Sequence, residues 1–153
     1  MATRKHVHTE VFPVTPEQLF ALLHTPLAIQ SWWQAARASV EPRAGGTFSV
    51  IWGADVDDPD YDTEATILAF DPPRRMVLGD YRYRAKSGPL PFEAKFVTEF
   101  AVAPHPQGAS LCVTQDGFPI RKEADLFFAG CEVGWRNTFA GIRRHLEANS
   151  GRA

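Results

Sequence analysis

Apolar side chains with helical spacing dominate the C-terminal part of the sequence. They are Phe128, Cys131, Trp135, Phe139, Ile142 and Leu146. Intervals of three and four residues put them on one face of a helix covering residues 123–148. At 1.5 Å per residue this helix would be about 40 Å long. Because a helix with one apolar face must bury it against another layer, the rest of the chain has to supply a cover of similar length.

The middle of the sequence has the two-residue period of β-strands. Alternation of this kind is found in residues 47–53, 66–70, 76–84, 92–103 and 110–115. Gly, Pro and Asp between these segments favour tight turns, so the strands are expected to form antiparallel hairpins. One more strand is expected from Lys5 to Phe12, because Val7, Thr9 and Val11 share one alternating face, as in a half-buried strand.

Two short helices are expected between the first and second strands. Thr15 is a suitable N-cap, Pro16 suits the first helical position, and Gln18 completes an approximate capping box. The first helix should run from Pro16 to about Leu23. A second helical turn at residues 26–30 leads to the adjacent Trp32 and Trp33.

These elements predict an α+β protein. Its curved antiparallel sheet of six to seven strands should wrap around the long C-terminal helix, the natural cover for the sheet's apolar face. The length of 153 residues fits a single domain over 1–153, ordered over residues 4–148 with a frayed tail at 149–153. A wedge between sheet and helix becomes a ligand cavity where aromatic side chains do not fill it.

Charge and composition restrict the partners. The formal net charge is only −2, which gives no field for holding nucleic acid. Residues 1–15 lack the apolar core of a signal peptide and no apolar run could span a membrane, so we expect a cytoplasmic protein. Cys112 and Cys131 lack C-x-x-C spacing and are expected to be buried thiols. We expect no cofactor and either a monomer or a homodimer.

Several segments resemble the START-like superfamily, also called SRPBCC. They are residues 11–20, 32–33, 45–48, 71–77, 115–118 and 134–135. More narrowly, they resemble the subgroup homologous to the C-terminal domain of the activator of heat-shock protein 90 ATPase. The resemblance covers nearly the whole chain and implies a helix-grip fold with a hydrophobic cavity. Relatives bind lipids, sterols, polyketides or plant hormones. Gln115 replaces a frequent histidine and Asp80 a frequent aromatic residue, so family roles at these two positions do not carry over.

Aromatic side chains are the candidate ligand contacts. Five of them are expected to face the space between sheet and helix, and the adjacent tryptophans its mouth, although ordinary core packing would also account for them. The five are Phe48, Trp52, Phe100, Trp135 and Phe139. The candidates are Trp32, Trp33, Phe48, Trp52, Tyr81, Tyr83, Phe100, Trp135 and Phe139. Tyr81 and Tyr83 share one face of their strand and Arg82 has the other, so either face would supply a polar ligand contact.

Metal and catalytic signatures are weak. The acidic stretch from Asp55 to Glu64 lacks the Gly and Glu positions of a calcium loop, so we interpret it as a solvated hairpin loop. His6 and His8 share a strand face, but no further ligand follows at a recognisable spacing; we interpret them as part of a polar face and expect no metal. No nucleophile signature is present.

Three functions remain open. The first is binding of a small hydrophobic or aromatic molecule between sheet and helix. The second, implied by the resemblance, is a module that interacts with a chaperone. The third is a cyclase- or hydrolase-like enzyme, whose acid or base would be Glu64, Asp80, Tyr81 or Glu99, although ion pairs of these acids with Arg82 or Arg84 are expected first.

Overall fold

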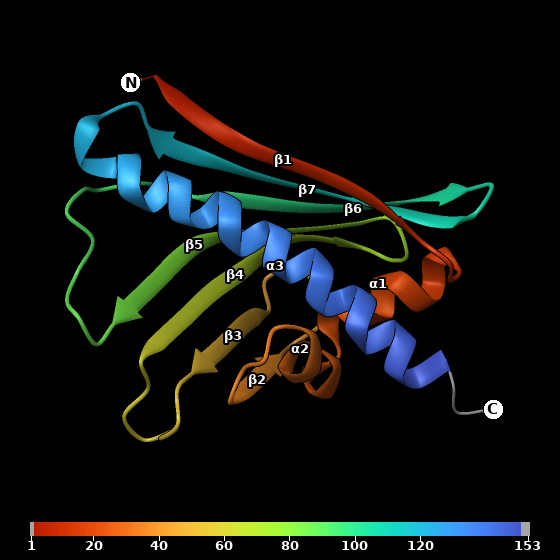
Figure 1. Ribbon diagram of the computed structural model, residues 1–153. Helices are drawn as coiled ribbons and strands as arrows, with labels where there is room; N and C mark the ends of the chain where they lie inside the picture. The colour runs from red at the N-terminus through yellow and green to blue at the C-terminus, as the bar shows by residue number, and fades with distance from the viewer. Residues whose placement is uncertain (1, 151–153) are drawn as a thin grey trace.

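One seven-stranded antiparallel sheet forms the body of the molecule, and a long helix crosses one of its faces (Figure 1). The computed structural model describes residues 2–150. The strands are β1 (Thr3–Phe12), β2 (Arg37–Val40), β3 (Thr47–Trp52), β4 (Tyr61–Asp71), β5 (Arg75–Ala85), β6 (Val97–His105) and β7 (Gly108–Pro119). Their order across the sheet is β1-β7-β6-β5-β4-β3-β2. The chain therefore brings its first strand beside its last.

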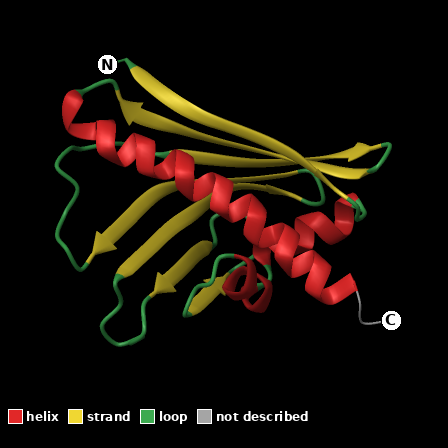
Figure 2. Ribbon diagram, in the orientation of Figure 1, coloured by secondary structure: helices red, strands yellow, loops and turns green. Residues whose placement is uncertain are grey.

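The helices follow the predicted order (Figure 2). They are α1 (Pro16–His24), α2 (Pro26–Trp32), the 3-10 helix η1 (Lys122–Ala124) and α3 (Asp125–Ser150). The Thr15 side chain accepts from the Gln18 amide at 3.1 Å, and the Gln18 side chain accepts from the Thr15 amide at 2.9 Å. This reciprocal capping box confirms the predicted helix start. The helix-grip arrangement, with α3 held by a curved sheet, is confirmed as well.

Some element boundaries were predicted wrongly. Residues 92–96 are not part of a strand, and β6 begins only at Val97. The reason is that Pro89 and Pro91, just before this segment, have no backbone N–H to donate to a neighbouring strand. The short β2 has too few residues for a clear period and was not identified individually. At the other end, α3 continues to Ser150. Residues 151–153 of the expected tail lie outside the described residues.

The buried face of β1 is opposite to the one predicted. Val7 is 53% exposed, whereas His6 is only 4% exposed and Phe12 is fully buried. The inward-facing set is thus His6, His8, Glu10 and Phe12. The reason is that His6 lies between two aromatic rings from other elements, with ring centroids 3.9 Å from Phe128 and 5.2 Å from Phe118. These partners are more than a hundred residues away in sequence, so strand periodicity carries no sign of them.

The helices α2 and α3 approach each other at Gly141. A Cβ atom at this position would lie 2.0 Å from the Trp32 carbonyl oxygen. Hydrogen alone therefore allows the two helix backbones to pack this closely. Among residues 2–150, none of the helices is both long and apolar enough to span a membrane.

Acidification should weaken the fold through His24. Burial lowers the pKa of this side chain, whose ring lies 5.5 Å from that of Phe20 and 5.3 Å from that of Phe70. Below pH 6.5 the unfolded chain takes up a proton that the folded chain resists, so stability should fall as the pH drops from 7 to 5. Urea unfolding at both pH values should show a smaller loss for His24→Gln than for the unmodified protein. An unchanged loss would mean that folded His24 is protonated freely.

Candidate functional site

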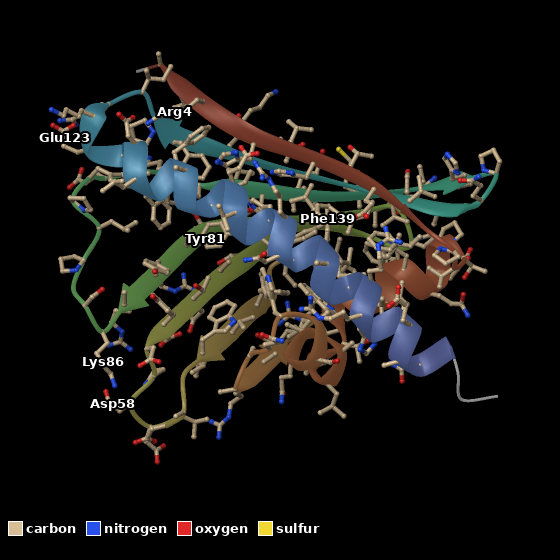
Figure 3. All side chains as sticks on the ribbon, viewed as in Figure 1. Arg4, Asp58, Tyr81, Lys86, Glu123 and Phe139 are labelled. Carbon is tan, nitrogen blue, oxygen red and sulfur yellow. The ribbon has the colours of Figure 1, made fainter. Side chains whose placement is uncertain are left out.

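A partly enclosed, mainly apolar pocket of about 160 Å³ lies between α3 and the central strands. Its walls include seven of the predicted residues, namely Trp33, Phe48, Trp52, Tyr81, Tyr83, Phe100 and Trp135. The other lining residues are Thr63, Leu78, Phe96, Thr98, Gln115 and Phe127. Figure 3 shows Tyr81 on the face of the sheet that α3 crosses. The pocket is thus the wedge that a sheet gripping a helix was expected to leave.

Alternation along the strands supplies most of this lining. On β5, Leu78 and Tyr81 with Tyr83 face the helix, whereas Arg82 is exposed on the other side. The left-handed conformation of Asp80, with φ of 49°, lies between Leu78 and Tyr81 and accounts for their three-residue spacing on one face. On β6, Thr98 and Phe100 point inward with the ordinary two-residue period.

Two hydrogen bonds join polar side chains that line the pocket. Tyr81 donates its hydroxyl hydrogen to Thr98 Oγ1 at 2.7 Å. The Trp135 indole donates to Gln115 Oε1 at 2.5 Å, joining α3 to β7. Burial raises the pKa of the Tyr81 phenol far above its usual range, so the hydroxyl stays protonated at physiological pH. The pocket therefore offers neutral hydrogen-bonding groups in apolar surroundings.

Tryptophans form the wall near α2. Trp33 contacts Trp52 edge-on, with ring centroids 5.3 Å apart, and its indole donates to Thr138 Oγ1 at 2.7 Å. The Trp52 indole in turn donates to the Trp33 carbonyl oxygen at 3.1 Å. Each N–H of this pair is satisfied, so the two indoles are fixed in position and form a rigid apolar surface.

A phenylalanine cluster closes the opposite end. Phe127 on α3 lies 5.7 Å from both Phe96 and Phe92, measured between ring centroids. Beyond it is a more open groove of about 760 Å³, which shares Tyr81, Tyr83 and Phe96 with the pocket. These three side chains lie between the smaller pocket and the larger, more open groove.

Two candidate residues lie elsewhere. Trp32 is 2% exposed and donates its indole hydrogen to the Leu22 carbonyl oxygen at 2.9 Å, which makes it part of the core between α1 and α2. Phe139 is 5% exposed and stacks on Phe12 at 6.2 Å, on the β1 side of α3. Both face the interior, but neither lines the pocket.

The acidic candidates do not point into the pocket. Glu64 pairs with Arg82 at 2.7 Å, Glu99 pairs with Arg75 at 2.5 Å, and Asp80 is exposed. Of the pairs expected for these acids, Glu64 with Arg82 is confirmed. The acidic stretch is a loop only as far as Asp60, because Asp62 and Glu64 already belong to β4, and here the prediction of a loop was wrong. Asp58 in this loop lies 3.0 Å from Lys86 (Figure 3).

The cysteines Cys112 and Cys131 are both free thiols and half-buried. Burial raises the pKa of Cys131 to about 11, so it is protonated at neutral pH and a poor nucleophile.

Among the pocket-lining residues, the only ionisable side chains are the two tyrosines, and burial raises the pKa of each. The pocket holds no acid and base of matched pKa.

Phe96, Phe127 and Gln115 were missed as pocket residues. Phe127 could have been found, because it lies eight residues before Trp135 and so shares its helix face. Phe96 lies in the segment wrongly predicted as strand, so two-residue alternation cannot predict the direction of its side chain. Gln115 was noted only as a departure from the family pattern, and its bond to Trp135 depends on a contact between distant segments.

Comparison with known proteins supports the same fold. The family described as "Activator of Hsp90 ATPase homolog 1-like protein" matches residues 13–147. Protein MLL2253 from Mesorhizobium loti is 22% identical with a TM-score of 0.77, covering 95% of this chain and 98% of that one. A Staphylococcus aureus protein of unknown function, SA2116, is 9% identical with a TM-score of 0.76, covering 98% and 97%.

A third similar solved structure has a lower TM-score. CalU16 from Micromonospora echinospora is 14% identical with a TM-score of 0.66, covering 96% of this chain and 75% of that one. At such low identities these likenesses concern the fold alone. No curated protein matches the sequence.

Proposed function

The chain belongs to the activator of Hsp90 ATPase homolog 1-like family, and from that premise we propose that it binds a small aromatic molecule in the pocket beneath α3. The observation that carries this proposal is a partly enclosed space walled by aromatic rings, with hydrogen-bonding groups confined to a few positions. Ligand pockets of proteins have this composition. The free cysteines suit a cytoplasmic place of action.

The volume of the pocket limits the size of the ligand. An apolar cavity of about 150 Å³ accommodates benzene. The pocket, at about 160 Å³, therefore matches a single six-membered ring. A larger ligand would place one ring inside and extend past Phe96 into the adjoining groove.

The polar groups favour a ring that carries a hydroxyl or carbonyl oxygen. Thr98 Oγ1 and the Tyr81 hydroxyl can each donate or accept, and Gln115 offers both an amide donor and a carbonyl acceptor. A charged ligand would lose its hydration without meeting an opposite charge. We therefore propose neutral phenols, aromatic ketones and polyketide-like aromatics rather than fatty acids.

Binding rather than catalysis is the better supported role. General acid and base catalysis needs groups that exchange protons near the working pH. The phenols of Tyr81 and Tyr83 do not, because burial raises both pKa values. Glu64 and Glu99 are held in ion pairs on the opposite face of the sheet.

Blocking the pocket should abolish binding without unfolding the protein. In a thermal-shift screen of substituted phenols and aromatic ketones, we expect a ligand at a hundredfold excess over its dissociation constant to stabilise the protein by about 2.7 kcal/mol. Thr63→Trp places a large side chain at the pocket wall and should remove this shift. Native mass spectrometry should show the same loss of a 1:1 adduct.

Thr66→Trp is the matched control. Thr66 lies on the same strand but does not line the pocket, so this variant should keep the full shift. An equal loss of binding in both variants, or no shift for any ring-containing compound, would refute the proposal.

A chaperone interaction is the second candidate. The observation in its favour is that Leu126 and Val133, seven residues apart on α3, are 90% and 54% exposed. Side chains at this spacing lie on the same side of a helix and could contact a partner. The test is whether the chain accelerates ATP hydrolysis by Hsp90. Acceleration that is lost in a Leu126→Ser/Val133→Ser variant would favour this role over ligand binding.

A further inference from the structure

A histidine-rich cluster lies away from the aromatic pocket, where α3 packs against β1. A ring nitrogen of His6, a ring nitrogen of His8 and a carboxylate oxygen of Glu132 all lie within 4.8 Å of one another. Two of these residues alternate on one strand and the third comes from the helix above them. The fold thus adds a third ligand-type side chain to the His-x-His pattern.

Hydrogen bonding determines which nitrogen of His6 carries a hydrogen. Its Nε2 lies 2.7 Å from the Phe128 carbonyl oxygen, which can only accept, so Nε2 donates. The other nitrogen, Nδ1, faces Glu132 Oε2 at 3.4 Å. With its hydrogen on Nε2, the neutral ring has a lone pair on Nδ1, which a metal ion beside the carboxylate can bind.

The spacing fits a metal ion. Ligands about 2.0 to 2.1 Å from a tetrahedral zinc ion lie about 3.4 Å apart, as Nδ1 and Oε2 do here. A metal-bound histidine also commonly donates its second ring N–H to a backbone carbonyl, as His6 does to Phe128. Stacking between His6 and Phe128 holds the ring in this orientation.

His8 supplies an independent observation. Its Nε2 is shielded from solvent and has no hydrogen-bond partner among residues 2–150. A shielded polar nitrogen without a partner is costly. If the His8 ring turns toward His6 and Glu132, this nitrogen can coordinate a metal ion together with them.

We propose that His6, His8 and Glu132 form a binding site for one divalent transition-metal ion of the zinc type. Two imidazoles and one carboxylate are a ligand set typical of zinc, whereas Ca²⁺ and Mg²⁺ prefer oxygen ligands. His8 and Arg136 also line a groove beside the cluster, so His8 can be reached from solvent. Arg136 holds the other carboxylate oxygen of Glu132 at 3.0 Å and leaves Oε2 for the metal. This site does not depend on the proposed function of the aromatic pocket.

Zinc titration of the purified full chain tests the proposal. After removal of metal with a chelator, isothermal titration with Zn²⁺ should give one ion per chain, and the unfolding temperature should rise until one equivalent is bound. His8→Gln and Glu132→Gln should each weaken binding at least tenfold. Both variants should fold normally, because neither residue belongs to the hydrophobic core. Circular dichroism should confirm this.

His105→Gln is the matched control, because His105 is an exposed histidine on the hairpin between β6 and β7. It should bind zinc with unchanged affinity. Failure of the unmodified chain to bind zinc would overturn the proposal. Binding that persists in both His8→Gln and Glu132→Gln would also overturn it, since another site would then hold the metal.

Discussion

Replacing Gly141 by alanine is expected to destabilise the fold by about 3 kcal/mol or more, the upper end of the usual range for overpacked sites. The added methyl group would stand 2.0 Å from the Trp32 carbonyl oxygen and 3.1 Å from the Trp32 carbonyl carbon. Backbone atoms cannot rotate away as a flexible side chain can. The two helices would have to separate, which would open the tightly packed core around Trp32 and Ile142. Chemical unfolding monitored by tryptophan fluorescence measures this loss.

Gly130→Ala provides the comparison within the same helix. A Cβ at Gly130 meets nothing within 4 Å, so this substitution should stabilise the protein by up to about 1 kcal/mol through helix propensity alone. The two glycines are therefore expected to respond with opposite signs. A similar small gain at Gly141 would show that α2 and α3 are farther apart than the structure has them.

The second large effect is expected at Trp135. The indole is 7% exposed, lines the pocket, and donates a hydrogen bond to Gln115. Trp135→Ala should cost about 3 to 5 kcal/mol of stability, as for other large aromatic residues removed from a core. It should also abolish ligand binding, because the pocket loses the larger of its two α3 side chains. Urea unfolding and the thermal-shift screen together measure both effects.

Trp135→Phe separates packing from hydrogen bonding. Phenylalanine keeps most of the apolar wall but leaves Gln115 Oε1 without its donor, at a cost of about 1 to 3 kcal/mol for an unpaired buried group. It should bind single-ring ligands more weakly than the unmodified chain but better than Trp135→Ala. Equal binding by all three proteins would place the ligand outside this pocket.

Predictions based on local periodicity succeeded where one element decides the outcome. The face of α3 that carries Trp135 and Phe139 was predicted from its spacing. The shared strand face of Tyr81 and Tyr83 was predicted too, but that this face is the inner one is known only from the structure. Each of these rests on the geometry of a single helix or strand. The capping box at Thr15 belongs to the same class, because donor and acceptor are three residues apart.

Predictions failed where a distant partner decides the outcome. On β1, the β-branched Val7 looked like the buried residue, yet His6 is buried because Phe118 and Phe128 enclose it. The same separation hid Glu132 as a companion of the two histidines. Alternation along a strand predicts that its two faces differ in polarity. Side chains of other elements decide which face is buried and whether a polar residue on that face finds a hydrogen-bond partner.

The pairing of β1 with β7 has a consequence for how the chain folds. Thr3 pairs with Pro119 and Phe12 pairs with Ala109, so each residue of β1 pairs with a residue about a hundred positions later in the sequence. Closing such long loops costs entropy before any contact compensates for it, and topologies of this kind fold slowly. During synthesis on the ribosome, β1 is made first and joins the sheet among the last. Its ladder and the His6 contact with α3 therefore form only when almost the whole chain has emerged.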